Sequence, residues 1–262
     1  MEKQSSNPKN VEFHTDTNPS KDRVSDVNIL SKGECLGEGK FSSSVNKVEA
    51  TVVNGSGNES SPHTFVLKNY RFPQSLGSSG KKPGENALDN FNLLKSKGFK
   101  TWSTFRLSED KGSAIMTNGN SEGRSLIATN ITLNTNTCET ALILEGKPLK
   151  TIKNFESFLA SLFAEALKAE KEKIYINLDS YGFLVEDSSI RDGVTQLDFV
   201  LCDLDNVEID EISQKYDLDV QMAYDAFKIF LMTYVDAGPA YDYIMATQSY
   251  IDQNLPGKLY KK

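Results

Sequence analysis

The stretch Lys173–Val185, KIYINLDSYGFLV, decides how this sequence is interpreted. Its apolar run breaks at Asn177 and Asp179, passes through Ser-Tyr-Gly at 180–182, and resumes as Phe-Leu-Val at 183–185. Two apolar runs joined by a short polar segment are typical of two strands and a connecting loop. We therefore expect the polar atoms of this loop at the mouth of a hydrophobic core, where they are available for chemistry.

The composition restricts the class of protein. The chain has 262 residues, of which 38% are hydrophobic and 25% charged, so it can bury a sizeable core. Its net charge of −7 and pI near 5.1 argue against nucleic acid or an anionic membrane as a partner. No apolar run approaches the roughly 18 residues of a membrane span, and the N-terminus lacks the apolar core of a signal peptide. We expect a cytoplasmic protein, although export by a non-classical route leaves no mark in a sequence.

Histidine and cysteine are too scarce for several common kinds of site. Only His14 and His63 are present, one in a polar N-terminal segment and one in a Ser-rich turn, so Ser-His-Asp and Cys-His catalysis are not expected. Cys35, Cys138 and Cys202 are widely spaced and form no CxxC motif, which argues against zinc sites and disulfide scaffolds. We expect each cysteine to be a small core residue. Any metal or nucleotide chemistry must then use carboxylates.

The N-terminal half predicts a polar tail and a small lobe. Residues 1–28 contain almost no apolar side chains and are expected to be a flexible tail. Within residues 29–118, a Gly-rich hairpin over 34–53 and a strand beginning FVLK at Phe65 are followed by helical spacing that ends at Gly98. Two short strands around a charged turn complete a lobe of five strands and one helix.

The C-terminal half, residues 119–262, predicts a mainly helical lobe. Apolar residues recur at helical spacing over 154–173, directly before the quoted stretch. A hairpin turn then leads to the strand LDFVLCDLDNVEI, which we expect to end on Asp203 and Asp205. Two more helices are expected around 218–236 and 240–253.

The order of these elements resembles the protein kinase family. The phosphate-covering loop of that family, GxGxxGxV, is similar to LGEGKFSSSV, with Gly37 and Gly39 at the first two glycines and Ser42 at the third. The segment FVLK looks like the family's V-A-I-K strand, with Lys68 at the lysine. The resemblance implies that Lys68 contacts the phosphates of a nucleotide, and that the small loop residues let the backbone approach them.

Two further features of the N-terminal half fit this resemblance. The family pairs its strand lysine with a helix glutamate, for which Glu85 is the first candidate and Asp89 the second. Glu85 also lies at a helix start, where a carboxylate is favoured by the helix dipole, so a purely structural role is a real alternative. The segment AIMTNG, with Met116 and Asn118, is similar to the hinge that carries the adenine.

The quoted stretch carries the third match, because it resembles the catalytic loop HRDxxxxN. Asn177 lies at the catalytic aspartate and Gly182 at the metal-binding asparagine, whereas Asp179 lies two residues after the usual acid. The segment VLCDLDNV is similar to the D-F-G strand, with Asp203 at the metal ligand and Asp205 at the glycine. The resemblance covers about residues 30–210 and implies binding of ATP and Mg²⁺. No A-P-E motif follows, so a conventional peptide substrate is in doubt.

The sequence therefore predicts an α+β, two-lobed protein kinase-like fold and leaves three functions open. The first is a pseudokinase that binds nucleotide and acts through a protein partner, since the Asn177 amide cannot accept a proton. The second is an active atypical kinase that uses Asp179 or Asp205 as its acid and transfers the ATP γ-phosphate to a protein or small-molecule hydroxyl. The third is a non-catalytic α+β binding domain, in which the same residues are turns and surface charges.

Overall fold

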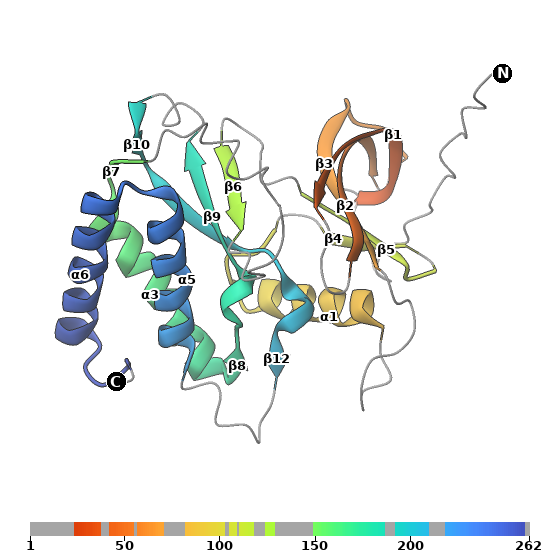
Figure 1. Cartoon of the computed structure of the whole chain (residues 1–262). Helices are drawn as coiled ribbons and strands as arrows, with labels where there is room; N and C mark the ends of the chain where they lie inside the picture. Colours follow the sequence, from red (N-terminus) through yellow and green to blue (C-terminus); the bar gives the residue numbers. More distant parts are fainter. Residues whose placement is uncertain are drawn as a thin grey trace. The chain divides into compact units, whose positions relative to one another are not determined.

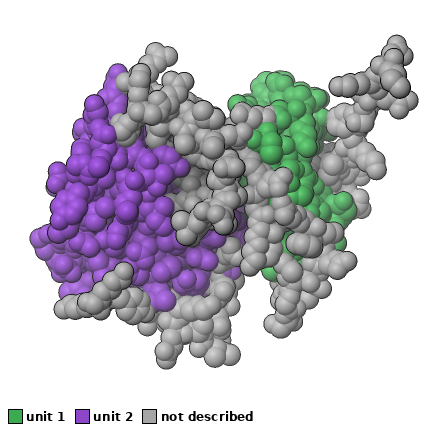
Figure 2. All heavy atoms as spheres, in the orientation of Figure 1, with its two compact units in different colours: residues 1–88, 103–118 green, residues 89–102, 119–262 purple. Residues whose placement is uncertain are grey.

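The computed structural model describes residues 24–37, 42–54, 57–70, 82–102, 105–108, 110–117, 124–128, 149–186, 192–209 and 218–259. The chain divides into two compact units (Figure 2). The N-terminal unit consists of residues 1–88 and 103–118, and the C-terminal unit of residues 89–102 and 119–262. Each unit is described by itself below.

The N-terminal unit contains a five-stranded antiparallel sheet in the order β1-β2-β3-β5-β4 (Figure 1). Its strands are β1 (Val24–Gly37), β2 (Ser42–Asn54), β3 (His63–Tyr70), β4 (Phe105–Leu107) and β5 (Ser113–Thr117). The predicted hairpin and the three further strands are confirmed. Residues 24–28, predicted as the end of the polar tail, are instead the first residues of β1, while the rest of that tail lies outside the described residues.

The core of this sheet follows the two-residue period of its strands. On β2, the buried Val48 and Ala50 alternate with the exposed Lys47 and Glu49. They belong to a buried cluster on one face of the sheet, formed by Val27, Val48, Ala50, Phe65, Leu67 and Ile115. This burial stabilises the sheet by roughly 25 cal/mol per Å² of apolar surface removed from water. Cys35, expected in the core, is exposed near the end of β1, outside this cluster.

The predicted helix of the N-terminal half is α1 (Pro83–Ser96). Proline is well tolerated in the first turn of a helix because its missing N–H has no helical partner there. The helix ends before Gly98, whose φ of +71° is the left-handed conformation common at helix C-termini. The boundary between the two units falls inside α1, between Leu88 and Asp89.

The C-terminal unit contains a three-stranded antiparallel sheet, in the order β11-β9-β6, and, among its described residues, three long helices (Figure 1). The strands of this sheet are β6 (Arg124–Ala128), β9 (Tyr181–Glu186) and β11 (Leu197–Leu201). The helices are α3 (Phe155–Glu172), α5 (Asp219–Tyr234) and α6 (Ala237–Asn254). Two short strand pairs are also present, β7 (Thr151–Ile152) with β10 (Val194–Thr195) and β8 (Ile174–Tyr175) with β12 (Glu208–Ile209).

Aromatic side chains fill the core between these helices and the sheet. Phe183 of β9 contacts Phe227 and Phe230 of α5, with ring centroids 5.7 and 4.9 Å apart. Phe158 of α3 lies 5.0 Å from Phe227 and 6.2 Å from Phe199 of β11. The strand that follows the quoted polar loop is therefore fixed by the core, and the loop is held at its edge.

The predicted α+β class is confirmed, with an antiparallel sheet and one helix in the N-terminal half and a mainly helical C-terminal half. Two boundaries were wrong. The strand expected to end on Asp203 and Asp205 stops at Leu201, and the last helix, α6, begins at Ala237 rather than around residue 240. In the described part of the chain, no helix is both long and apolar enough to cross a membrane.

Candidate functional site

The predicted phosphate-covering loop connects β1 to β2. Gly37 is the last residue of β1 and pairs with Val45, and Ser42 is the first residue of β2. The Ser42 side chain is buried, with 2% of its surface exposed. Gly39 lies outside the described residues. The sequence therefore located the strands on both sides of the loop correctly.

Lys68 lies near the end of β3, where it pairs with Val45 of β2 and Ala114 of β5. Its side chain is half-buried, and its ammonium lies 5.4 Å from the centre of the buried Tyr70 ring. A cation over an aromatic face is stabilised by the ring quadrupole. The Lys68 side chain is thus placed by the sheet and supported by an aromatic neighbour.

The predicted hinge begins in the adjacent strand. Met116 of β5 is buried, with 7% of its surface exposed, and its backbone pairs with Val66 and Phe105. Met116 therefore occupies an interior position of the sheet. Asn118, the other predicted hinge residue, lies outside the described residues.

Glu85 lies in the first turn of α1 and makes two described contacts. Its carboxylate forms an ion pair with Lys111 and accepts a hydrogen bond from the Lys82 backbone N–H at 2.9 Å. These contacts lower the pKa of the Glu85 carboxyl, mainly through the Lys111 hydrogen bond and next through the Lys82 N–H. They also fit a helix-capping role, because an anion at a helix N-terminus is favoured by the dipole. Pairing of Glu85 with Lys68 stays a prediction.

The predicted catalytic loop is a single 3₁₀ turn, η2 (Leu178–Ser180), between β8 and β9. Asn177 caps this turn, because its side-chain Oδ1 accepts a hydrogen bond from the Leu178 N–H at 2.8 Å. Asp179 lies inside the turn and is half-buried. Asn177 therefore has a local structural role, and its place at a catalytic-acid position stays a prediction from the sequence.

The turn that carries the predicted metal ligands follows β11 directly. Asp203 precedes the 3₁₀ turn η3 (Leu204–Asn206), which contains Asp205, and both side chains are half-buried. We call residues 202–207 the acidic turn. The antiparallel register pairs Leu201 with Tyr181, so the end of β11 lies beside the start of β9. The acidic turn and η2 are consequently at the same end of the sheet.

Ser180 links η2 to the acidic turn directly. Its backbone C=O accepts a hydrogen bond from the Cys202 N–H at 2.8 Å, and its hydroxyl donates one to the Asp203 C=O at 2.6 Å. The Ser180 side chain is fully buried. The structure therefore joins the turn η2, which contains Asp179 and is capped by Asn177, to the acidic turn through Ser180.

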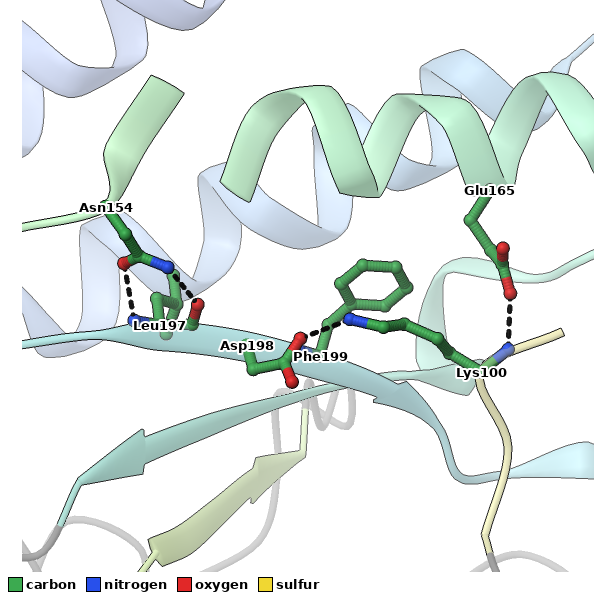
Figure 3. Close-up of polar contacts among 6 residues, drawn as sticks. All are labelled: Lys100, Asn154, Glu165, Leu197, Asp198 and Phe199. Carbon is green, nitrogen blue, oxygen red and sulfur yellow. Dashed lines mark hydrogen bonds and ion pairs between the residues drawn. The ribbon is translucent and has the colours of Figure 1, made fainter. Parts of the chain in front are cut away.

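Side chains that the sequence did not single out hold the strand β11 in place. Asn154, before α3, accepts a hydrogen bond from the Leu197 N–H and donates one to its C=O, both at 2.8 Å (Figure 3). Further along the strand, Lys100 Nζ lies 2.5 Å from Asp198 Oδ1, and the Lys100 backbone N–H donates to Glu165 of α3 (Figure 3). The strand that carries the acidic turn is thus fixed from its first residue onward.

Asp219 is another buried acid that the sequence analysis missed. It lies in the first turn of α5 with none of its surface exposed, and its Oδ1 accepts a hydrogen bond from the Ile176 N–H at 2.8 Å. Asp219 therefore anchors the residue directly before Asn177. Burial raises the pKa of the neighbouring Tyr181 hydroxyl well above its usual value, and the negative charge of Asp219 raises it further. The signal available in the sequence was the position of Asp219, an acid at the start of an apolar helical segment.

The donor set of the acidic turn can be compared with the requirements of a magnesium ion. Among the described residues, no group of three His, Cys, Asp or Glu side chains could hold a metal ion. Mg²⁺, however, usually binds through one or two carboxylates together with waters and substrate phosphates. Asp203 and Asp205, on one half-buried turn, fit a Mg²⁺ ion that binds together with a nucleotide. They do not fit a site that the protein forms alone.

No family model matches this sequence, and no curated protein matches it either. Two solved structures of the Rio2 kinase from Chaetomium thermophilum are similar to it, one of them an ADP/Mg²⁺-phosphoaspartate complex. That complex has 13% identity and a TM-score of 0.42, with 86% of this chain and 66% of that chain covered. The other has 14% identity and a TM-score of 0.42, with 83% and 63% covered.

This chain therefore spans just under two thirds of the length of either Rio2 kinase structure. The order of its own elements, a five-stranded antiparallel sheet with one helix followed by a mainly helical unit, is consistent with the two-lobed protein kinase-like fold.

Proposed function

We propose that this protein is a kinase-like nucleotide-binding protein whose phosphoryl transfer is absent or very slow, and that it acts by binding a protein partner. In this proposal Lys68 contacts the phosphates of ATP, and Asp203 holds Mg²⁺ with help from Asp205. Magnesium bound there would neutralise phosphate charge.

One observation carries this proposal: Ser180 joins the loop of Asn177 to the turn of Asp203 by two hydrogen bonds. Phosphoryl transfer depends mainly on positioning and charge neutralisation, so it needs the residue that orients the acceptor hydroxyl and the acid that holds the metal on one rigid support. The Ser180 contacts provide such a support within the C-terminal unit.

The chemistry of Asn177 supports the absence of efficient transfer. An amide holds a hydroxyl by hydrogen bonding but accepts no proton, and general-base assistance is worth about 10²- to 10⁴-fold in rate. The Oδ1 atom of Asn177 is also engaged by the Leu178 N–H. A protein that keeps the shape of the loop and lacks the proton acceptor is suited to binding nucleotide and presenting a surface to a partner.

The second candidate is an active atypical kinase that uses Asp179. The observation in its favour is that Asp179 lies in the same 3₁₀ turn as the cap Asn177 and is only half-buried. Since positioning supplies much of the catalysis in phosphoryl transfer, a displaced acid does not by itself abolish activity.

Nucleotide titration followed by thermal unfolding tests the proposal, with and without Mg²⁺. At a nucleotide concentration of 100 Kd, binding stabilises a protein by about 2.7 kcal/mol, which corresponds to a rise in Tm of about 5 to 10 °C for a chain of this size. We expect this rise with ATP and Mg²⁺ and a smaller one with ATP and EDTA. If ATP leaves the Tm unchanged in both conditions, the proposed nucleotide binding is wrong.

A further inference from the structure

The backbone of the acidic turn is bound by side chains from three separate parts of the C-terminal unit. The Trp102 indole N–H donates to the Cys202 C=O at 3.1 Å, and the Ser180 hydroxyl donates to the Asp203 C=O at 2.6 Å. The Asn90 side-chain amide donates to the Leu204 C=O at 2.7 Å and to the Val207 C=O at 3.0 Å. Carbonyls 202, 203, 204 and 207 thus each accept a hydrogen bond from a side chain.

Asn90 is the most specific of these donors. It lies in the second half of α1 with 6% of its surface exposed, and its Nδ2 atom carries two hydrogens, one for each of the two carbonyls. The two acceptors are three residues apart in the chain, so one side chain closes the turn that contains Asp205. Few other side chains place two donors on a single atom at this short distance from a helix.

We propose that Asn90 is a positioning residue, which holds Asp203 and Asp205 in the arrangement required by a Mg²⁺-bound nucleotide. This inference rests on the proposed function, because it assigns Asn90 a role in the same site. Two acids separated by one residue repel each other, and a mobile turn would lose conformational entropy when a cation binds between or beside them. A turn that is already fixed through its carbonyls avoids this loss, which is the advantage of preorganisation.

The same contacts distinguish this turn from a switch. A segment that orders only on activation is held by few contacts in its resting state. Here the turn is bound by the side chains of Ser180, Trp102 and Asn90, and it is followed at once by the pairing of β12 with β8. We therefore expect the unmodified protein to bind Mg²⁺-nucleotide, with no activating modification needed first.

The test compares Asn90→Leu with Asn92→Leu in the full-length protein. Leucine has the γ-branched shape of asparagine, although it is larger, and it is a good helix former that donates no hydrogen bond. Asn92 lies on the same helix and is exposed, so Asn92→Leu is the matched control. Two quantities are measured: hydrogen exchange of the 203–207 amides without ligand, and ADP affinity with Mg²⁺ or with EDTA.

We expect Asn90→Leu to accelerate exchange within 203–207 while α3 and α5 stay protected. Loss of residues that orient metal ligands usually costs about 10- to 100-fold in metal affinity, so the gain in ADP affinity on adding Mg²⁺ should fall by about that factor. The affinity in EDTA should change little, whereas a general loss of fold would lower both affinities. The Asn92→Leu protein should behave as wild type.

The outcomes separate this inference from the proposed function. If wild type gains affinity with Mg²⁺ and Asn90→Leu gains as much, Asn90 does not position the acids and the proposed function is unaffected. If wild type binds no nucleotide, the proposed function fails and the positioning role fails with it, whatever the exchange data show about the turn. If Asn90→Leu does not fold, the same measurements are made on Asn90→Ala, which removes the amide without adding volume, and an unchanged Mg²⁺ effect in that variant would overturn the inference.

Discussion

Replacing Asn177 by aspartate tests most directly whether the lack of a carboxylate at this position is what prevents phosphoryl transfer. The change should cost little stability, because Asn and Asp are nearly equivalent as helix caps and the new carboxylate can accept the same hydrogen bond from the Leu178 N–H. We expect the free energy of unfolding to change by less than about 0.5 kcal/mol. The substitution therefore changes the chemistry of the position and preserves its structure.

The expected gain in rate follows from general-base assistance. Such assistance is worth about 10²- to 10⁴-fold, which is about 2.7 to 5.4 kcal/mol of activation free energy at 1.36 kcal/mol per tenfold. If the nucleotide binds as proposed and only the base is missing, Asn177→Asp should show transfer where wild type shows none or a trace. The gain should require Asp203, because Asn177→Asp with Asp203→Asn lacks the metal ligand.

The assay uses labelled ATP and Mg²⁺ with the purified protein, and follows self-labelling together with transfer to generic protein and small-hydroxyl acceptors. Asp179→Asn is the necessary companion, because Asp179 lies in the same turn. Robust transfer by wild type that disappears in Asp179→Asn would refute the reasoning about Asn177 and establish the atypical kinase. Transfer that is absent in wild type and detectable in Asn177→Asp would support it.

Three further predictions concern individual side chains. Lys68→Ala should remove most of the ATP-dependent rise in Tm, and the exposed Lys47→Ala on the neighbouring strand should remove none; equal effects would exclude a specific phosphate contact at Lys68. Asp203→Asn should abolish the Mg²⁺-dependent part of nucleotide affinity and Asp205→Asn should weaken it less, so a reversed order in titrations would mean that the metal ligands are assigned two residues out of register. Glu85→Gln should lower the free energy of unfolding near pH 7 by no more than about 1 kcal/mol, since the ion pair with Lys111 is partly exposed. Because the folded-state pKa of Glu85 is lowered, this contribution is present above the unfolded pKa and is lost as the pH falls through the folded pKa. Denaturant curves of the variant and the wild type should therefore converge at acidic pH.

The sequence predicted those parts of the structure that are determined by local pattern. Helical spacing over 154–173 corresponds to α3 at Phe155–Glu172, and the apolar run before Asp203 corresponds to β11. The polar interruption at Asn177 corresponds to the turn η2. In each case the residues that define the element are neighbours in the chain, so periodicity and turn composition are sufficient to find it.

The contacts that complete the C-terminal half of the site were not predictable in the same way. Asn90 and Leu204 are 114 residues apart in the sequence, and Trp102 and Cys202 are 100 apart. Their pairing depends on how α1 and the segment after it meet β11 in three dimensions, and no local pattern encodes that. Trp102 is buried, and its indole N–H has a specific acceptor that composition alone does not reveal.

The outer edge of β11 limits how a protein partner can bind. This strand is at the end of its sheet, and alternate backbone N–H groups of such a strand point away from the neighbouring strand. Each of the three outward groups already has an acceptor: the Leu197 N–H bonds to Asn154, the Phe199 N–H to the Asp198 side chain, and the Leu201 N–H to the Lys100 C=O. A partner therefore cannot join this sheet by adding a strand to β11, and recognition at this edge must use side chains instead.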